Sequence, residues 1–276
     1  MGRDAYRLGR GLYMFCRGDI NNNSNTNGEF MVQKAVLLAK NVHNENKFVI
    51  FDIGANIGEW SNNLLLLSRD LKNNSSFNLF LFEPAPDIAS TLKNNLLNTN
   101  ANICIEEIAM SNSDGFAEFY IGGLNSESNS FYPEGIADKK TKITVQQNTV
   151  NQYCESKKIS HVHLLKCDTE GHDMEVILGT LPMFKNENIS VLQFEYNHTW
   201  VFGKHFLRDV FSAIEFLPYK ITKLQADHLL VFEEWHPELE RFFEGNYAIV
   251  HNDAISWFKT KIAHFDKWGT LRISCS

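Results

Sequence analysis

The sequence lacks the features of a membrane-spanning or disulfide-bonded protein. No apolar run approaches the roughly 20 residues that a bilayer helix needs, and no charged-then-apolar leader opens the chain. The five cysteines are scattered, odd in number and without C-x-x-C spacing, so we expect reduced thiols. These absences predict a cytoplasmic protein with no membrane partner.

The sequence also has fewer basic residues than acidic ones. Lys and Arg number 26 against 33 Asp and Glu, which gives a formal charge of -7 and argues against nucleic acid as a partner. Hydrophobic residues make up 43% and charged residues 21%, values ordinary for a globular protein. The chain is long enough for one large α/β domain with appendages, which is the organisation we expect.

The sequence also lacks a glycine in the middle of the turn that follows the first buried strand. The apolar run 48–53 fits a parallel strand, and it leads through Gly54-x-Asn56-x-Gly58 into a helical pattern. The dinucleotide fingerprint G-x-G-x-x-G would place a glycine where Asn56 stands. Asp52, near the end of the strand, would repel a pyrophosphate but attract an amine or a sulfonium. S-adenosylmethionine carries both cations and no phosphate, and Glu83 at the end of the next strand supplies a second acid for its ribose.

Two later strands also end in acidic turns. The strand 162–167 leads into Asp168-Thr169-Glu170-Gly171-His172, and the strand 191–194 ends in Glu195. Methyl transfer to a neutral hydroxyl or amide needs a positioned base, so these acids and histidines are the catalytic candidates. The cluster of Asp168, Glu170, Asp173 and Glu195 leaves Mg²⁺ open as an additional ligand, although we predict no defined metal site.

Five motifs in one order give the sequence a family resemblance. They are FDIGANIGEWS at 51–61, FEPAPD at 82–87, EIAMSNSDG at 107–115, LLKCDTEGHDMEVILG at 164–179 and FEYN at 194–197. Together they resemble the FkbM-type family of S-adenosylmethionine-dependent class I methyltransferases, over roughly residues 47–200. The resemblance implies an α/β, Rossmann-like fold with a mostly parallel seven-stranded sheet and helices on both faces, plus an N-terminal helical arm.

The resemblance also implies roles for individual residues, with S-adenosyl-L-methionine as methyl donor. The expected cofactor-binding residues are Asp52, Gly54, Ala55, Asn56, Gly58, Glu83, Pro84, Ile108, Ala109 and Asp168. The expected catalytic residues are Asp168, Glu195, Glu170 and His172. Glu170 and His172 could equally cap and support the following helix, whereas Glu195 ends a core strand expected to lie beside Asp168.

The rest of the chain is divided around this core. We expect an N-terminal arm and helix at 1–46, the methyltransferase domain at 47–250 and a C-terminal extension at 251–276. The segment 116–121 is expected to pair antiparallel with the strand 103–108. The polar insertion 122–142 is expected to be mobile and functional, and 234–276 to be irregular apart from a strand at 247–250.

Several functions remain open at this stage. The first is O-methylation of a hydroxyl on a small molecule, sugar or natural product, and the resemblance also admits N-methylation of a peptide amide. A nicotinamide-dependent oxidoreductase is disfavoured by Asp52 and Asn56. A non-catalytic, partner-binding domain is disfavoured because the acids at the strand ends are retained. The sequence does not indicate the oligomeric state.

Overall fold

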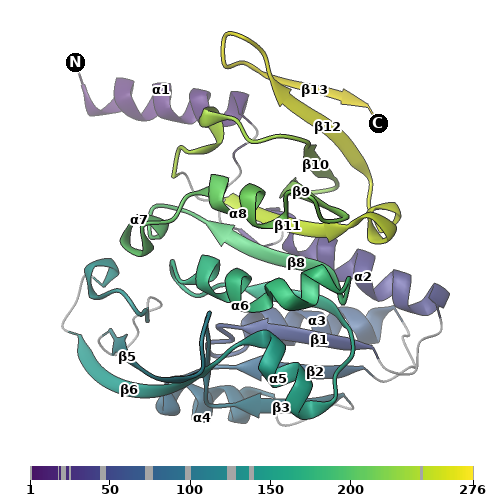
Figure 1. Ribbon diagram of the computed structural model, residues 1–276. Coiled ribbons are helices and arrows are strands. Elements are labelled where there is room, and N and C mark those ends of the chain that lie inside the picture. Colours follow the sequence, from purple (N-terminus) through teal and green to yellow (C-terminus); the bar gives the residue numbers. More distant parts are fainter. Residues whose placement is uncertain are drawn as a thin grey trace.

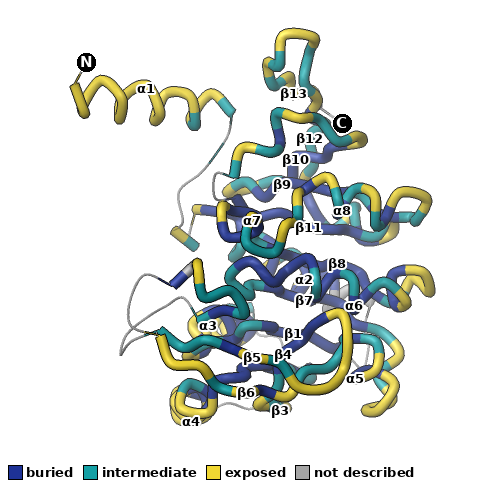
Figure 2. The backbone as a smooth tube through the Cα atoms, turned by 60° about the vertical axis from the view of Figure 1, so that its left-hand side comes forward, coloured by how far each residue is buried: buried dark blue, intermediate teal, exposed yellow. Residues whose placement is uncertain are grey.

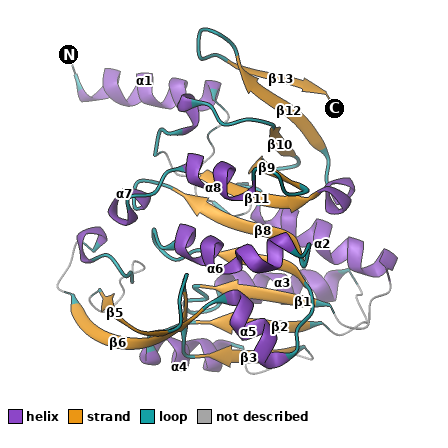
Figure 3. Ribbon diagram, in the orientation of Figure 1, coloured by secondary structure: helices purple, strands orange, loops and turns teal. Residues whose placement is uncertain are grey.

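The fold is described from a computed structural model of the chain. It covers residues 2–17, 19, 23–24, 26–43, 48–71, 77–96, 101–122, 129–136, 140–242 and 245–275. Within these residues the chain forms one large sheet, one small sheet and helices on both faces of the large sheet (Figures 1 and 3).

The large sheet confirms the predicted α/β class but not the predicted number of strands. Seven strands were expected, and ten are present in the described part of the chain. In spatial order they are β13 (Leu271–Cys275), β12 (Thr260–Phe265), β10 (Leu229–Phe232), β9 (Tyr219–Leu224), β11 (Gly245–His251), β8 (Ile189–Tyr196), β7 (Val162–Cys167), β1 (Val49–Ile53), β2 (Asn78–Phe82) and β3 (Asn102–Glu106).

The half of the sheet from β3 to β8 is parallel and carries the motifs. β1 pairs with β2 on one side and β7 on the other, and β7 pairs with β8. All five residues of β1 are buried, which explains why its sequence is almost continuously apolar. The parallel order confirms that Asp168 follows a neighbour of the first strand and that Glu195 lies on the next strand along. The carboxyl ends of four motif-bearing strands therefore meet at one edge.

The other half is mainly antiparallel and accounts for the three additional strands. β11 confirms the strand expected at 247–250 and lies between β8 and β9, antiparallel to both. The expectation that the rest of 234–276 is irregular is wrong, because β12 pairs parallel with β10 and antiparallel with β13. β12 is largely half-exposed, so it has no clear apolar alternation by which the sequence could reveal it.

The helices cover both faces of the large sheet. Helices α2, α3 and α4 contribute to one apolar core, which includes Ile50 and Leu164, and α5, α6 and α8 contribute to the other, which includes Phe51 and Leu165. Adjacent strand residues thus serve opposite faces, as the pleat requires. The helices are α1 (Arg3–Cys16), α2 (Glu29–His43), α3 (Glu59–Asp70), α4 (Pro86–Asn95), α5 (Val150–Lys157), α6 (Asp173–Lys185), α7 (Trp200–Gly203) and α8 (Leu207–Ile214). Short 3-10 helices η1, η2 and η3 cover Pro133–Gly135, Pro237–Leu239 and Asn252–Trp257.

The small sheet corrects another prediction. Its strands are β4 (Ala109–Met110), β6 (Thr141–Asn148) and β5 (Gly115–Ile121), in that order. β5 pairs antiparallel with β6 rather than with the third strand of the core, because β3 already lies beside β2 in the large sheet. The small sheet brings the segment after β3 and the end of the insertion to the same side of the molecule.

The two N-terminal helices have different surroundings. α1 has no buried residue and extends away from the body, as its exposed colour in Figure 2 shows. α2 is packed on the sheet through Val32, Val36 and Leu37, each fully buried. The predicted helical arm is therefore present, and its second helix reaches the core.

Candidate active site

The structure has a cavity of about 650 Å³ at the carboxyl ends of β1, β2, β7 and β8. Its size falls within the range of small-molecule sites, and its position is where open α/β sheets bind ligands. The described lining residues are Ser24, Glu29, Phe30, Ile53, Gly54, Ala55, Asn56, Ile57, Glu59, Trp60, Asn63, Phe82, Glu83, Pro84, Ile108, Ala109, Met110, Phe119, Asn129, Phe131, Lys166, Asp168, Thr169, Glu170, Glu195 and Asn246.

The turn after β1 forms one wall of this cavity. Gly54, Asn56 and Gly58 all have positive φ, at 76°, 47° and 90°, a region that favours glycine and tolerates asparagine. A Cβ on Gly54 would lie 1.9 Å from the backbone oxygen of Asp168, so only glycine allows the two loops to approach this closely. The turn is thus built to bring the ends of β1 and β7 together.

Glu83 is held at the cavity wall by two backbone donors. The Asn56 and Ala85 N–H groups each donate to its carboxylate at 3.0 Å, and the residue is 5% exposed. Burial raises the pKa of Glu83 to about 7, although the two backbone hydrogen bonds act in the opposite direction. Pro84 lines the cavity next to it. A carboxylate oriented in this way has acceptor capacity left for a pair of ligand hydroxyls.

The apolar side of the cavity adjoins Glu83. Ile108, Ala109 and Met110 follow β3 and line the cavity, as expected for the first two. Asn129 and Phe131 line it from the insertion. Part of the insertion predicted at 122–142, namely 123–128 and 137–139, lies outside the described residues.

The structure places Asp52 elsewhere than expected. Its side chain is 0% exposed and is not part of the cavity lining, so it makes no direct contact with the space where a ligand would lie. The Ser61 hydroxyl donates to its Oδ2 at 2.6 Å, and Lys166 Nζ lies 3.7 Å from its Oδ1. Burial raises the pKa of Asp52, and Lys166 opposes that shift. The fully buried β1 directs this side chain beneath the cavity.

Lys166 forms ion pairs with the buried carboxylate of Asp52 and with the partly exposed carboxylate of Asp168. Its Nζ lies 3.2 Å from Oδ2 of Asp168, whose side chain is 38% exposed and lines the cavity. Burial lowers the pKa of Lys166, but the carboxylates of Asp168, Asp52 and Glu29 outweigh this effect and the net shift is upward. Lys166 is therefore a permanent cation, and it holds Asp168 in place beside the turn.

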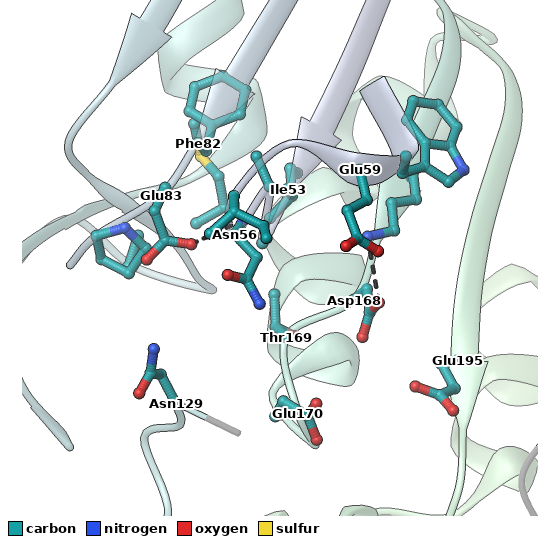
Figure 4. Close-up of a pocket in the computed structure, with 18 of the residues that line it drawn as sticks. Ile53, Asn56, Glu59, Phe82, Glu83, Asn129, Asp168, Thr169, Glu170 and Glu195 are labelled. Carbon is teal, nitrogen blue, oxygen red and sulfur yellow. Dashed lines mark hydrogen bonds and ion pairs between the residues drawn. The ribbon is translucent and has the colours of Figure 1, made fainter. Parts of the chain in front are cut away.

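Three further polar residues complete this end of the cavity. Glu170 follows Asp168 in the loop after β7, while Glu195 and Asn246 occupy paired positions on β8 and β11. Figure 4 shows Asp168 and Glu195 toward the right of the view, Glu170 at the lower centre and Glu83 toward the left. The carboxyl groups of three predicted catalytic residues are thus brought to one end.

His172, the fourth predicted catalytic residue, is not part of the cavity lining. It is 7% exposed, its Nε2 lies 3.0 Å from the Ser111 hydroxyl, and its ring stacks on Phe131 with centroids 3.9 Å apart. Burial lowers the pKa of His172 to about 3, so the ring is neutral. This placement suits a residue that positions Phe131 rather than one that touches a ligand.

Several lining residues were not predicted from the sequence. Glu59 and Lys166 lie inside the family motifs and could have been suspected from their position there. Glu29, at the start of α2, has no such signal, because only the packing of α2 brings it to the cavity. Burial raises the pKa of Glu29, and Lys166 opposes the shift.

The described residues contain neither a metal-binding cluster nor a membrane-spanning helix. Among them, no group of three or more His, Cys, Asp or Glu side chains is arranged to hold a metal ion. None of the helices in the described ranges is long and apolar enough to cross a membrane.

Known proteins resemble this chain in sequence and in shape. A hexuronic acid methyltransferase, AglP, of Haloferax volcanii is 25% identical over 185 residues, which cover 66% of this chain and 69% of that protein. An S-adenosylmethionine-dependent methyltransferase of Agrobacterium tumefaciens has a TM-score of 0.42 at 8% identity, over 81% of this chain and 62% of that one. A TehB-like methyltransferase of Corynebacterium glutamicum has a TM-score of 0.34 at 10% identity, over 90% and 97%.

The family assignment rests on a sequence model, since these TM-scores are low. The model described as the methyltransferase FkbM domain matches residues 52–226, more than half of the chain. The match includes the turn after β1, Glu83 and the acidic loop after β7. The chain therefore belongs to the FkbM family of methyltransferases and is an enzyme that uses S-adenosylmethionine as its methyl donor.

Proposed function

We propose that this enzyme transfers the methyl group of S-adenosylmethionine to a hydroxyl of a sugar or a related small molecule. The single observation that carries the proposal is the placement of Glu83 and Asp168 on either side of the turn after β1, in one cavity. The relative in Haloferax volcanii, named as a methyltransferase of hexuronic acid, supports a sugar as the acceptor.

The cavity has groups that suit a nucleoside-type cofactor, namely a carboxylate acceptor and an apolar surface. Glu83, fixed by two backbone N–H groups, would accept from the paired ribose hydroxyls. Ile108, Ala109 and Met110 offer an apolar surface to the adenine, and the turn at Gly54 and Asn56 borders the rest. When bound, S-adenosylmethionine supplies the methyl group and leaves as S-adenosylhomocysteine.

The other end of the cavity provides the base. The acceptor hydroxyl loses its proton as its oxygen forms the new bond to carbon, and we assign that proton to the Asp168 carboxylate. Glu195 and Glu170 line the same end and orient the acceptor. Lys166 holds Asp168 in position, and Asp52 beneath it holds Lys166, so we revise the role of Asp52 from direct cofactor contact to support.

The test is a methylation assay with methyl-labelled S-adenosylmethionine and a panel of sugars and peptides. A labelled ether on a sugar supports the proposal, and labelled amide nitrogen on a peptide overturns it. Calorimetric titration with S-adenosylhomocysteine, NAD and ATP is the matching control, because only the first should bind. The cytoplasmic location and the exclusion of nucleic acid stay predictions.

A further inference from the structure

Helix α1 has an apolar side and a basic side. Its apolar side is formed by residues at helical spacing, namely Ala5, Leu8, Leu12 and Phe15. The opposite side carries the exposed arginines Arg3, Arg7 and Arg10. Asp4 is the one acidic residue of the helix, so α1 is basic although the whole chain has a formal charge of -7. The sequence of α1 is thus that of a basic amphipathic helix.

The apolar side of α1 faces solvent. Leu8, Leu12 and Phe15 are between 62% and 80% exposed, and none of the 14 residues of the helix is buried. A Cβ built on Gly9 or Gly11 would meet no atom of the described residues within 4 Å. A helix of this length is marginal in water without packing, and each glycine weakens it further. A surface that covers the apolar side would therefore stabilise α1.

A second exposed aromatic residue lies at the same end of the molecule, at the hairpin tip, residues 266–270 between β12 and β13 (Figures 1 and 2). Glu238 of η2 contacts both elements. The Tyr13 hydroxyl donates to its Oε2 at 3.4 Å, and a Cβ on Gly269 would lie 3.3 Å from its Cγ. Trp268 at the hairpin tip is 79% exposed, and Lys267 Nζ lies 5.0 Å from its ring centroid. This end of the molecule therefore combines exposed apolar side chains with cations.

We propose that α1 and the hairpin tip bind the surface of a membrane that contains anionic phospholipids. Fourteen residues are fewer than the roughly 20 that a spanning helix needs, so α1 lies on the membrane and does not cross it. A basic amphipathic helix buries its apolar side among the acyl chains, while its arginines attract the lipid phosphates. Tryptophan is enriched at the same interface. The inference is independent of the methyl acceptor, and it replaces the expectation of no membrane partner.

The first experiment tests the charge of the partner. Co-sedimentation of the full chain is compared for vesicles of phosphatidylcholine and phosphatidylglycerol, in a ratio of about 3:1, and for vesicles of phosphatidylcholine alone. We expect binding to the mixed vesicles to be tighter by about tenfold or more at low salt, and high salt to reduce this difference. Arg3→Gln combined with Arg7→Gln should weaken binding to the mixed vesicles about tenfold and leave binding to phosphatidylcholine unchanged.

The second experiment tests the apolar contacts. Leu8→Ser combined with Leu12→Ser removes two side chains from the apolar side and should weaken binding to the mixed vesicles by about tenfold or more. Trp268→Ser should cause a smaller loss, because it removes one side chain. Phe116→Ser is the matched control, since Phe116 is 77% exposed but lies on β5, at the other end of the molecule (Figure 1). This variant should bind the mixed vesicles as the unchanged protein does.

The affinity for S-adenosylhomocysteine shows whether each variant is folded. None of the substituted residues belongs to the described cavity lining, so this affinity should stay unchanged. Equal binding to both kinds of vesicle, or binding to neither, would overturn the proposal. So would an equal loss in Phe116→Ser. A dimer in solution that dissociates in the Leu8 and Leu12 variant would also overturn it, because the apolar side would then be covered by a second copy of this chain.

Discussion

The two ends of the cavity hold their carboxylates in different ways. Glu83 is buried and accepts from two backbone N–H groups, whereas Asp168 is 38% exposed and is held by one lysine. A carboxylate fixed by backbone has one geometry and suits an invariant partner such as a ribose. A carboxylate that reaches into the cavity, held only by another side chain, can meet acceptors of different shapes. In the proposed function, this difference separates binding of the donor at Glu83 from chemistry on the acceptor at Asp168.

The largest effect is expected from Asp168→Asn. The amide keeps the shape of the side chain but cannot take the acceptor's proton, so turnover should fall by about 10²-fold or more. Affinity for S-adenosylmethionine should stay within a few-fold, because Asp168 lies at the acceptor end. Steady-state rates and calorimetric titration measure the two quantities separately.

Glu195→Gln is the control for that prediction. If Glu195 shares the proton-accepting role, the double variant should be little slower than either single variant, since residues acting as a unit are not additive. Normal turnover in Asp168→Asn would contradict the proposed role of Asp168 as the base. So would a defect that excess cofactor fully restores.

The second effect is at the opposite end, in Glu83→Ala. Loss of a charged acceptor for two hydroxyls should weaken S-adenosylhomocysteine binding by roughly 2 kcal/mol, which is about 30-fold. The variant Glu83→Gln keeps an acceptor oxygen without the charge. Its affinity for S-adenosylhomocysteine should lie between those of the unchanged enzyme and Glu83→Ala. Unchanged affinity in both variants would remove Glu83 from the donor site.

The third effect is a dependence of S-adenosylhomocysteine affinity on pH, caused by the ionisation of Glu83. Burial raises the pKa of Glu83 to about 7 in the empty protein, and ribose hydroxyls donate best to the ionised form. Affinity for S-adenosylhomocysteine should therefore fall by about tenfold from pH 8 to pH 6. Glu83→Gln should bind with no such slope, and an equal slope in that variant would assign the titration to another group.

The same shift has a consequence for the stability of the ligand-free protein. A raised carboxyl pKa means that the folded state holds the proton more tightly than the unfolded chain does. Glu83 therefore destabilises the protein progressively as the pH rises from about 4.5 to about 7. Denaturant titrations at several pH values should show a shallower decline in Glu83→Gln.

The smallest effect on catalysis is expected from His172→Ala. The change removes the contact with Ser111 and the stacking on Phe131, so hydrogen exchange over residues 129–136 should become faster. The acceptor KM should change only a few-fold and S-adenosylhomocysteine affinity should not change. His172→Phe, which keeps a ring beside Phe131, should restore most of the protection. A loss of turnover near 10²-fold would instead make His172 a catalytic residue.

The family motifs allowed the sequence to predict the parallel half of the sheet, and most of the residues predicted for the site line the cavity. The exceptions are Asp52, Gly58 and His172, which are absent from the described lining. β1, β7 and β8 are buried on both faces and β2 on one, so their apolar runs are evident, and an acid or glycine turn marks each carboxyl end. Asp52 shows the limit of this reasoning. An acid near a strand end can line the cavity or lie beneath it, and the choice depends on the packing around Lys166.

The remaining features depend on contacts between distant segments. Glu29 reaches the cavity only because α2 packs on the sheet, 23 residues before Asp52. β12 and β13 form at a partly exposed edge, where polar residues are tolerated and the alternation of buried positions is weak. No short window of sequence contains either kind of information.

The position of β11 has a consequence for how the chain is made. This strand lies between β8 and β9, although both precede it in the sequence. Until the ribosome has released residues 245–251, β8 has a neighbour on one side only, and its outer edge is open to pairing with another chain. Asn246, the partner of Glu195 in the register, arrives with that late strand. A nascent chain that stops at residue 226, where the family match ends, would therefore carry every motif and still leave one wall of its cavity unfinished.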